Sequence, residues 1–77
     1  MDPDATWKEM LDAAAARDWA IAEERARALL DWIGKKGFPP TTSNQAGLPK
    51  SWHHAVTYRT CHLVLSWRKR PRGRRPA

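Results

Sequence analysis

One apolar stripe, closed by a turn that no helix continues through, constrains the fold of this chain most. Between residues 19 and 33, apolar side chains recur at spacings of three and four, the period of one helix face. The stripe consists of Trp19, Ala22, Ala26, Leu29, Leu30 and Ile33. Two consecutive prolines follow at 39 and 40, and proline lacks the N–H group that would extend a helix. The pattern predicts a helix over about residues 18–36.

Both ends of this helix carry recognisable signals. Asp18 precedes the stripe, where a short acidic side chain accepts hydrogen bonds from free backbone N–H groups. Gly37 follows the helix and is predicted to take the left-handed conformation that ends many helices. Phe38, the next residue, is then expected to fold back as an apolar contact.

A first helix is predicted over about residues 6–16, with Thr6 as its N-cap and Glu9 completing a capping box. Because only Arg17 and Asp18 separate it from the next helix, we expect the two to lie antiparallel as a helical hairpin. Alanines on the facing stripes would let the two backbones approach closely. Two helices bury too little apolar surface alone, so a third element or a second subunit is required.

The third element follows a connector rich in turn-forming residues at 39–50, and its type is ambiguous. A helical stripe is formed by Trp52, Val56, Leu63 and Trp67. Ser51 stands where it can cap such a helix. Several β-branched residues favour a strand instead, but a lone strand would have no partner within this chain. We predict a helix over about residues 51–68 and keep a strand over 55–66 as the alternative.

These elements predict an all-α fold over residues 1–67: an antiparallel helical hairpin plus a third C-terminal helix, packed as a small three-helix bundle. Residues 68–77 are expected to form a disordered basic tail. A chain of 77 residues needs most of its apolar side chains for its core and has few left for a deep pocket. We therefore expect a binding protein rather than an enzyme.

Several other classes of protein are unexpected. No run approaches the roughly 20 apolar residues of a membrane span. The first residues are acidic, where a secretory signal carries positive charge. The single cysteine, Cys61, excludes an internal disulfide and fits a reducing compartment. We expect a cytoplasmic protein without a membrane partner.

The net charge of +6 comes entirely from the C-terminal end. Residues 1–67 contain eight basic and eight acidic groups, whereas residues 68–77 contain six basic groups and no acid. Such an asymmetry is typical of an arm that binds an anionic partner, and a solubilising tail is the alternative. The residues expected to contact nucleic acid are Arg68, Lys69, Arg70, Arg72, Gly73, Arg74 and Arg75.

The centre of the tail, residues 70–74, resembles the AT-hook, a short DNA-binding motif built around Arg-Gly-Arg flanked by prolines. The resemblance implies that Gly73, which has no side chain, lets the backbone lie deep in the minor groove. Arg72 and Arg74 would extend along the groove, and the narrow groove of A·T tracts attracts arginine. In this chain Arg75 separates the second core arginine from the proline that the family places next to it. We expect DNA rather than RNA as the partner.

Five tryptophans are many for this length. They could form a platform for stacking bases, but large aromatics more simply fill the core of a very small domain. Trp32 falls beside the main stripe of its helix and is predicted to lie at the surface. Together with Phe38 it would form an apolar patch for a protein partner or a second copy of the chain.

His53, His54, Cys61 and His62 invite a metal site. On a helix, His54 and Cys61 lie two turns apart on one face and could supply two ligands. No second close pair completes a tetrahedral set, and no third group orients a Cys61–His54 nucleophile pair. We expect no metal, no cofactor and no catalytic residue, with the thiol buried.

The body as a whole resembles small uncharacterised bacterial proteins with a helical hairpin that ends in a Gly-Phe-Pro-Pro turn. The residues that carry the resemblance are Asp18, Trp19, Leu29 to Trp32, Gly37 to Pro40, Trp52, Ala55, Val56, Thr60 and Cys61. The resemblance implies a fold and no activity. The sequence predicts an accessory nucleic-acid-binding protein whose body self-associates or docks, with a protein-interaction module or small regulator as the alternative.

Overall fold

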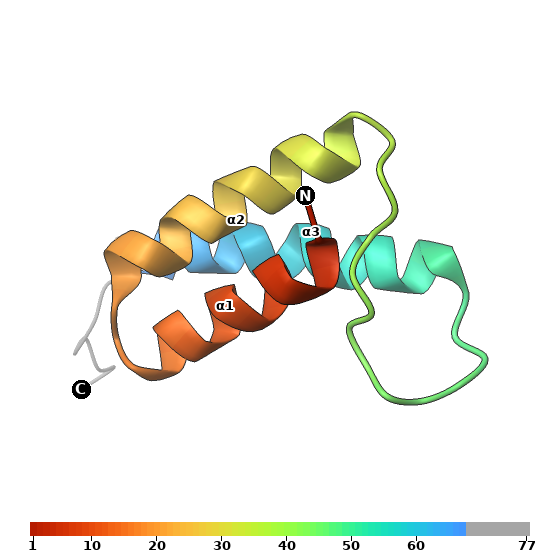
Figure 1. The fold of residues 1–77 in the computed structure, drawn as a ribbon, viewed down its shortest axis with the longest axis horizontal. Coiled ribbons are helices and arrows are strands. Elements are labelled where there is room, and N and C mark those ends of the chain that lie inside the picture. Colours follow the sequence, from red (N-terminus) through yellow and green to blue (C-terminus); the bar gives the residue numbers. More distant parts are fainter. Residues whose placement is uncertain (68–77) are drawn as a thin grey trace, which may run out of the picture.

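The computed structural model describes residues 1–67, which form three α-helices and, within that range, no strand (Figure 1). α1 spans Pro3–Ala15, α2 spans Trp19–Gly34 and α3 spans Lys50–Ser66. The all-α fold is confirmed, and the third element is a helix rather than a strand. The predicted tail, residues 68–77, lies outside the described residues.

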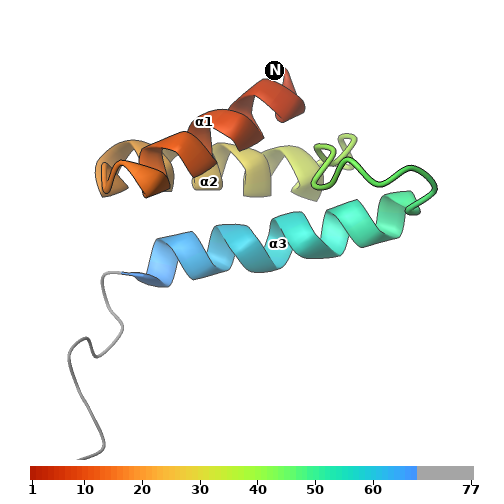
Figure 2. The same cartoon turned by 90° about the horizontal axis from the view of Figure 1, so that it is seen from below.

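The helices lie in two layers. α1 and α2 form an antiparallel hairpin, as predicted, and α3 lies across the hairpin as a separate layer (Figures 1 and 2). α2 is the central helix, because it packs against both α1 and α3. One side of α3 therefore faces the hairpin, and its opposite side faces away from both other helices (Figure 2). Within residues 1–67, none of the helices is long and apolar enough to cross a bilayer.

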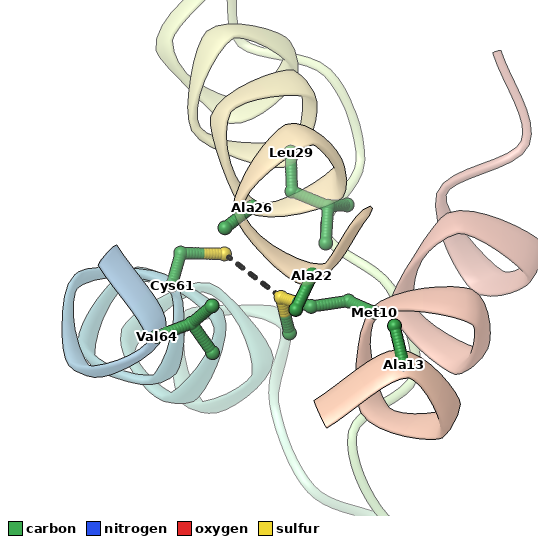
Figure 3. Close-up of a cluster of buried hydrophobic side chains, with 7 residues drawn as sticks. All are labelled: Met10, Ala13, Ala22, Ala26, Leu29, Cys61 and Val64. Carbon is green, nitrogen blue, oxygen red and sulfur yellow. Dashed lines mark hydrogen bonds between the residues drawn. The ribbon is translucent and has the colours of Figure 1, made fainter. Parts of the chain in front are cut away.

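The core is built from small side chains around two larger ones. Met10 of α1 and Leu29 of α2 are fully buried. The thiol of Cys61 in α3 lies 3.9 Å from the Met10 sulfur, so the two sulfur atoms connect α1 with α3 (Figure 3). The cluster is completed by Ala13, Ala22, Ala26 and Val64. Buried alanines keep the distance between helices short, as expected from the stripes.

The tryptophans do not fill this core. Trp7 and Trp19 are half-buried and cover its edge. Trp52 and Trp67 are 49% and 43% exposed, so the prediction that they fill the core is wrong. The alanines bring the helices too close together to leave room for an indole between them. Trp67 instead stacks on Trp19 at the rim, with ring centroids 5.8 Å apart.

α1 begins earlier than predicted, because Asp2 rather than Thr6 is the N-cap. The Asp2 carboxylate accepts from the backbone N–H groups of Asp4 and Ala5 at 3.0 and 3.2 Å. Thr6 lies inside the helix, and its hydroxyl donates to the Asp2 carbonyl at 3.0 Å. Pro3 suits the first helical position, where its missing N–H has no partner to lose. The capping box is therefore wrong.

Of the N-caps predicted for the other two helices, one is confirmed and one is wrong. Asp18 caps α2 as predicted, and its carboxylate accepts from the Ile21 N–H at 3.3 Å. Ser51 does not cap α3, because the helix already begins at Lys50. Its N-cap is Pro49, which has no side-chain hydrogen bond to offer.

The end of α2 has the predicted left-handed turn, shifted by one residue. Lys36 takes the left-handed conformation, with φ of 68°, in place of Gly37. The Gly37 N–H then donates to the Trp32 carbonyl at 2.9 Å, which closes the turn. Phe38 does not fold back as predicted but is 69% exposed.

The connector between α2 and α3 is fixed at both sides. Thr41 donates its backbone N–H to the Asp4 carboxylate of α1 at 2.7 Å. Thr42 donates its backbone N–H to Nδ1 of His53 in α3 at 3.0 Å. Pro40, between α2 and these contacts, is fully buried. These contacts hold the start of α3 against the rest of the molecule.

Candidate nucleic-acid interface

The basic side chains of residues 1–67 differ in whether a carboxylate neutralises them. Those in α1 and α2 mostly have such a partner. The ion pairs are Lys8–Asp12 at 2.9 Å, Arg25–Glu9 at 2.8 Å, Arg25–Glu24 at 2.7 Å, Arg27–Glu23 at 3.9 Å and Lys35–Asp31 at 3.0 Å. Hydrogen bonds from these partners raise the pKa of Lys8 and of Arg25. Neighbouring carboxylates therefore largely neutralise the positive charge of these side chains.

Four basic side chains within residues 1–67 make no ion pair there. They are Arg17, Lys36, Lys50 and Arg59. The guanidinium of Arg17 donates to the Ala14 carbonyl, and the Lys50 ammonium lies 5.0 Å from the centroid of the Phe38 ring. Arg17 sits in the turn between α1 and α2, and the other three follow α2. The charge that is free to act on a ligand therefore lies mostly in the second half of the chain.

The carboxylates are distributed in the opposite way. All eight lie between Asp2 and Asp31, and none follows. Residues 1–34 contain eight acidic and four basic groups, whereas residues 35–67 contain four basic groups and no acid. The body is neutral in sum, as the sequence indicates, but the hairpin is acidic and the connector with α3 is basic.

The outer side of α3 carries polar and apolar side chains and no carboxylate. The buried side of the helix consists of Thr57, Cys61 and Val64. The outer face, which we define by its exposed residues opposite that side, consists of Trp52, Ala55, Arg59, His62 and Ser66, with Ser51, Tyr58 and Leu63 at its edges. The rings of Tyr58 and His62 lie against each other with centroids 4.5 Å apart. The basic segment predicted to contact nucleic acid follows this helix directly in the sequence.

The predicted partner patch, Trp32 with Phe38, is brought together by the turn after α2. The Trp32 indole N–H donates to the Phe38 carbonyl at 2.8 Å. Its ring also covers Gly37, where an added Cβ would lie 2.6 Å from Nε1 and 2.7 Å from Cδ2. Trp32 is therefore half-buried as a support of its own turn, and Phe38 supplies the exposed surface.

Three shallow pockets border α3. One lies between α2 and α3, has a volume of about 350 Å³ and is lined by Leu30, Ile33, Tyr58 and His62. The second lies against α1, has a volume of about 290 Å³ and is mostly apolar; its walls include Leu11, Trp19, Leu63 and Trp67. The third lies at the start of α3, has a volume of about 340 Å³ and is bordered by Lys36, Lys50 and His54. Sequence reasoning did not single out Lys36, Lys50 or Arg59. The signal that could have found them is the absence of any acid after Asp31.

Two of the candidate metal and nucleophile residues, Cys61 and His53, have structural roles. Burial raises the pKa of the Cys61 thiol to about 12, so at neutral pH it is neither a thiolate nucleophile nor a good metal ligand. His53 holds the connector by accepting from Thr42. Among residues 1–67, no three His, Cys, Asp or Glu side chains gather closely enough to hold a metal ion.

Comparisons of this chain with protein-family models, with curated proteins and with solved structures find no match.

Proposed function

We propose that this chain binds duplex DNA through its basic segment, residues 68–77, and that the helical body carries this segment and docks on a partner or a second copy. The observation that supports the proposal most is the charge distribution. Six basic groups without an acid follow a helix that has no carboxylate of its own. Phosphate is the chemistry that such a surface binds, with affinity gained from the release of counterions.

The AT-hook resemblance gives the proposal a more specific form. Arg72 and Arg74 would extend along the minor groove on either side of Gly73, and the other basic residues would contact phosphates. Binding would then combine a strong dependence on salt, from the charges, with a preference for A·T tracts, from the shape of the groove. In this form the chain is a binding protein without a catalytic site.

The experiment is a titration of fluorescent 20-base-pair duplexes, one A·T-rich and one G·C-rich, with the full chain and with residues 1–67. If all six basic residues of the segment engage, log affinity falls with log salt at a slope of about −5. Removing residues 68–77 should abolish most of the affinity while the helical circular dichroism stays. A shortened chain that binds as tightly as the full one would refute the proposal.

A matched variant separates groove binding from simple charge attraction. Gly73→Ala leaves every charge in place but adds a methyl group where the backbone has to approach the groove floor. We expect it to remove the preference for A·T-rich duplex and to leave the salt slope unchanged. An unchanged A·T preference would mean that the segment binds phosphates alone.

A second candidate function is protein docking, and the exposure of Phe38 favours it. A phenylalanine that is 69% exposed beside a half-buried tryptophan is an apolar patch held in a rigid turn. Phe38→Ser should then reduce self-association in sedimentation experiments while leaving DNA affinity intact. If the chain is monomeric with and without this substitution, the patch does not join two copies.

A further inference from the structure

We propose that the outer face of α3 is a second DNA-contacting surface, so that the duplex backbone lies along this helix as well as against the basic segment. This inference rests on the proposed function and extends it from the segment to the folded body. It begins from the two layers of the molecule: the hairpin carries all the carboxylates of the chain, and α3 carries none.

The outer face is accessible because α3 forms a layer of its own. The hairpin packs against the side of α3 that holds Thr57, Cys61 and Val64. The opposite side faces away from α1 and α2 along its whole length (Figure 2). At 1.5 Å per residue, the 17 residues of α3 extend over roughly 25 Å, the length of about seven base pairs of duplex.

The polar side chains of the outer face are those that contact phosphate and sugar in protein–DNA complexes. Arg59, in the middle of the face, has no carboxylate partner within residues 1–67, so its guanidinium is available to a phosphate. At the edge of this face, Tyr58 and His62 add a hydroxyl and an imidazole, groups that also contact phosphate, and both side chains border α2 there. Ala55, one turn away, is small enough to let the backbone of the duplex approach.

Further basic side chains lie near both ends of α3. Lys50 begins α3, and Lys36 borders the same shallow pocket at that end. At the other end Arg17 borders the pocket that Trp67 also lines. The basic segment follows Trp67 in the sequence. Basic side chains without an ion pair among residues 1–67 therefore lie in the middle of α3 and near both of its ends, where they border the grooves between α3 and the hairpin.

The hairpin offers no comparable surface. A duplex against α1 or α2 would meet exposed carboxylates such as Glu9, Asp12 and Glu24, and like charges in contact oppose binding. The same charge pattern gives the complex a defined orientation, with α3 toward the duplex and the hairpin away from it.

The test compares two substitutions that remove the same charge from different layers. Arg59→Gln lies on the outer face of α3, and Arg27→Gln lies on α2, where Arg27 is exposed and 3.9 Å from Glu23. In the full chain, on the 20-base-pair duplex, we expect Arg59→Gln to weaken binding about five- to tenfold and to reduce the salt slope by about one. Arg27→Gln should change the affinity less than about twofold, because its charge faces away from the duplex.

A second pair adds a negative charge instead of removing a positive one. Ala55→Glu lies on the outer face, and Ala20→Glu is its control at an exposed position of α2. We expect Ala55→Glu to weaken binding at least as much as Arg59→Gln. Thermal unfolding of each variant verifies that the fold is intact.

Two results together would overturn this inference and leave the proposed function standing. Removal of residues 68–77 would abolish binding, and the two members of each pair of substitutions would weaken binding equally. If removal of residues 68–77 left the affinity unchanged, the proposed function itself would be overturned. Tighter binding of single-stranded DNA of the same length would also contradict the duplex geometry argued here.

Discussion

Gly37 is required for a reason that the sequence suggests only in part. Its own φ is not in the left-handed region, and what excludes a larger residue is the Trp32 indole packed against it. We expect Gly37→Ala to destabilise the domain by about 1–3 kcal/mol, because the added Cβ displaces the indole from its hydrogen bond with the Phe38 carbonyl. The measurement is urea unfolding followed by tryptophan fluorescence.

Gly34 provides the control for that substitution. It ends α2, and an added Cβ there would meet no atom within 4 Å. Gly34→Ala should therefore stabilise the domain by about 0.5–1 kcal/mol, the usual advantage of alanine over glycine in a helix. Equal effects of the two substitutions would show that contact with Trp32 does not determine the need for glycine at position 37.

Thr57 is a polar residue of the core whose burial lowers the stability of the fold. It is fully buried, and its hydroxyl has no hydrogen-bond partner among residues 1–67. We expect Thr57→Val, which keeps the shape and removes the hydroxyl, to stabilise the domain by about 1 kcal/mol. For a domain of this size that free energy raises Tm by roughly 4–8 °C, which a thermal scan detects. A lower Tm would mean that the hydroxyl has a partner after all.

At the scale of the elements, α1 and α2 end with the same turn, and neither has glycine at its left-handed position. Arg17 and Lys36 have φ of 63° and 68°, a conformation that costs a residue with a side chain about 1–2 kcal/mol. Arg17→Gly and Lys36→Gly remove this strain, but glycine also raises the conformational entropy of the unfolded chain, which offsets part of the gain. We expect each to stabilise the domain by about 0.5–1 kcal/mol in urea unfolding. The exposed Lys8→Gly, inside α1, is the opposite control and should destabilise it.

The number, order and packing of the helices could be predicted from periodicity and punctuation. The stripe of α2 and the short turn at Asp18 were sufficient for the hairpin. The exact ends were less accessible, because Asp2 and Thr6 are both good N-caps, and Pro3 at the first helical position is the sequence signal that favours Asp2. The burial of tryptophans was predicted wrongly, since a stripe does not show how closely its alanines bring the helices together.

Less of the candidate site than of the fold could be predicted from the sequence. The sum of charges points to residues 68–77, and that prediction falls outside the described residues. The unpaired state of Arg59 could not be read from the sequence, because ion pairing depends on which helices become neighbours. Trp32 and Phe38 do meet at the turn after α2, but the sequence could not show that Trp32 supports the turn while Phe38 remains exposed.

At the scale of the whole molecule, Cys61 links stability to alkaline pH. Its pKa is about 12 in the folded protein against an ordinary value of 9.0. Below pH 9 the thiol is protonated in both the folded and the unfolded state and has no effect. Between pH 9 and 12 only the unfolded state loses the proton, so the free energy of unfolding falls by up to about 1.4 kcal/mol per pH unit.

A variant isolates the contribution of this thiol from that of the rest of the chain. Cys61→Ala is less stable at pH 7, because it leaves a cavity beside Met10. Its unfolding free energy should nevertheless decline less steeply above pH 9 than that of the unmodified chain. Parallel pH profiles of the two proteins in urea unfolding would show that the thiol ionises as easily in the core as in water.

The separation of acidic hairpin from basic third helix makes the molecule an electric dipole even before anything is bound. Near any polyanion it experiences a torque that turns one layer forward, so encounters begin in a single orientation. Molecules lined up in this way would present their negative backs to the solution. If the chain binds DNA as we propose, a coated duplex would then repel a second bare duplex instead of being bridged to it.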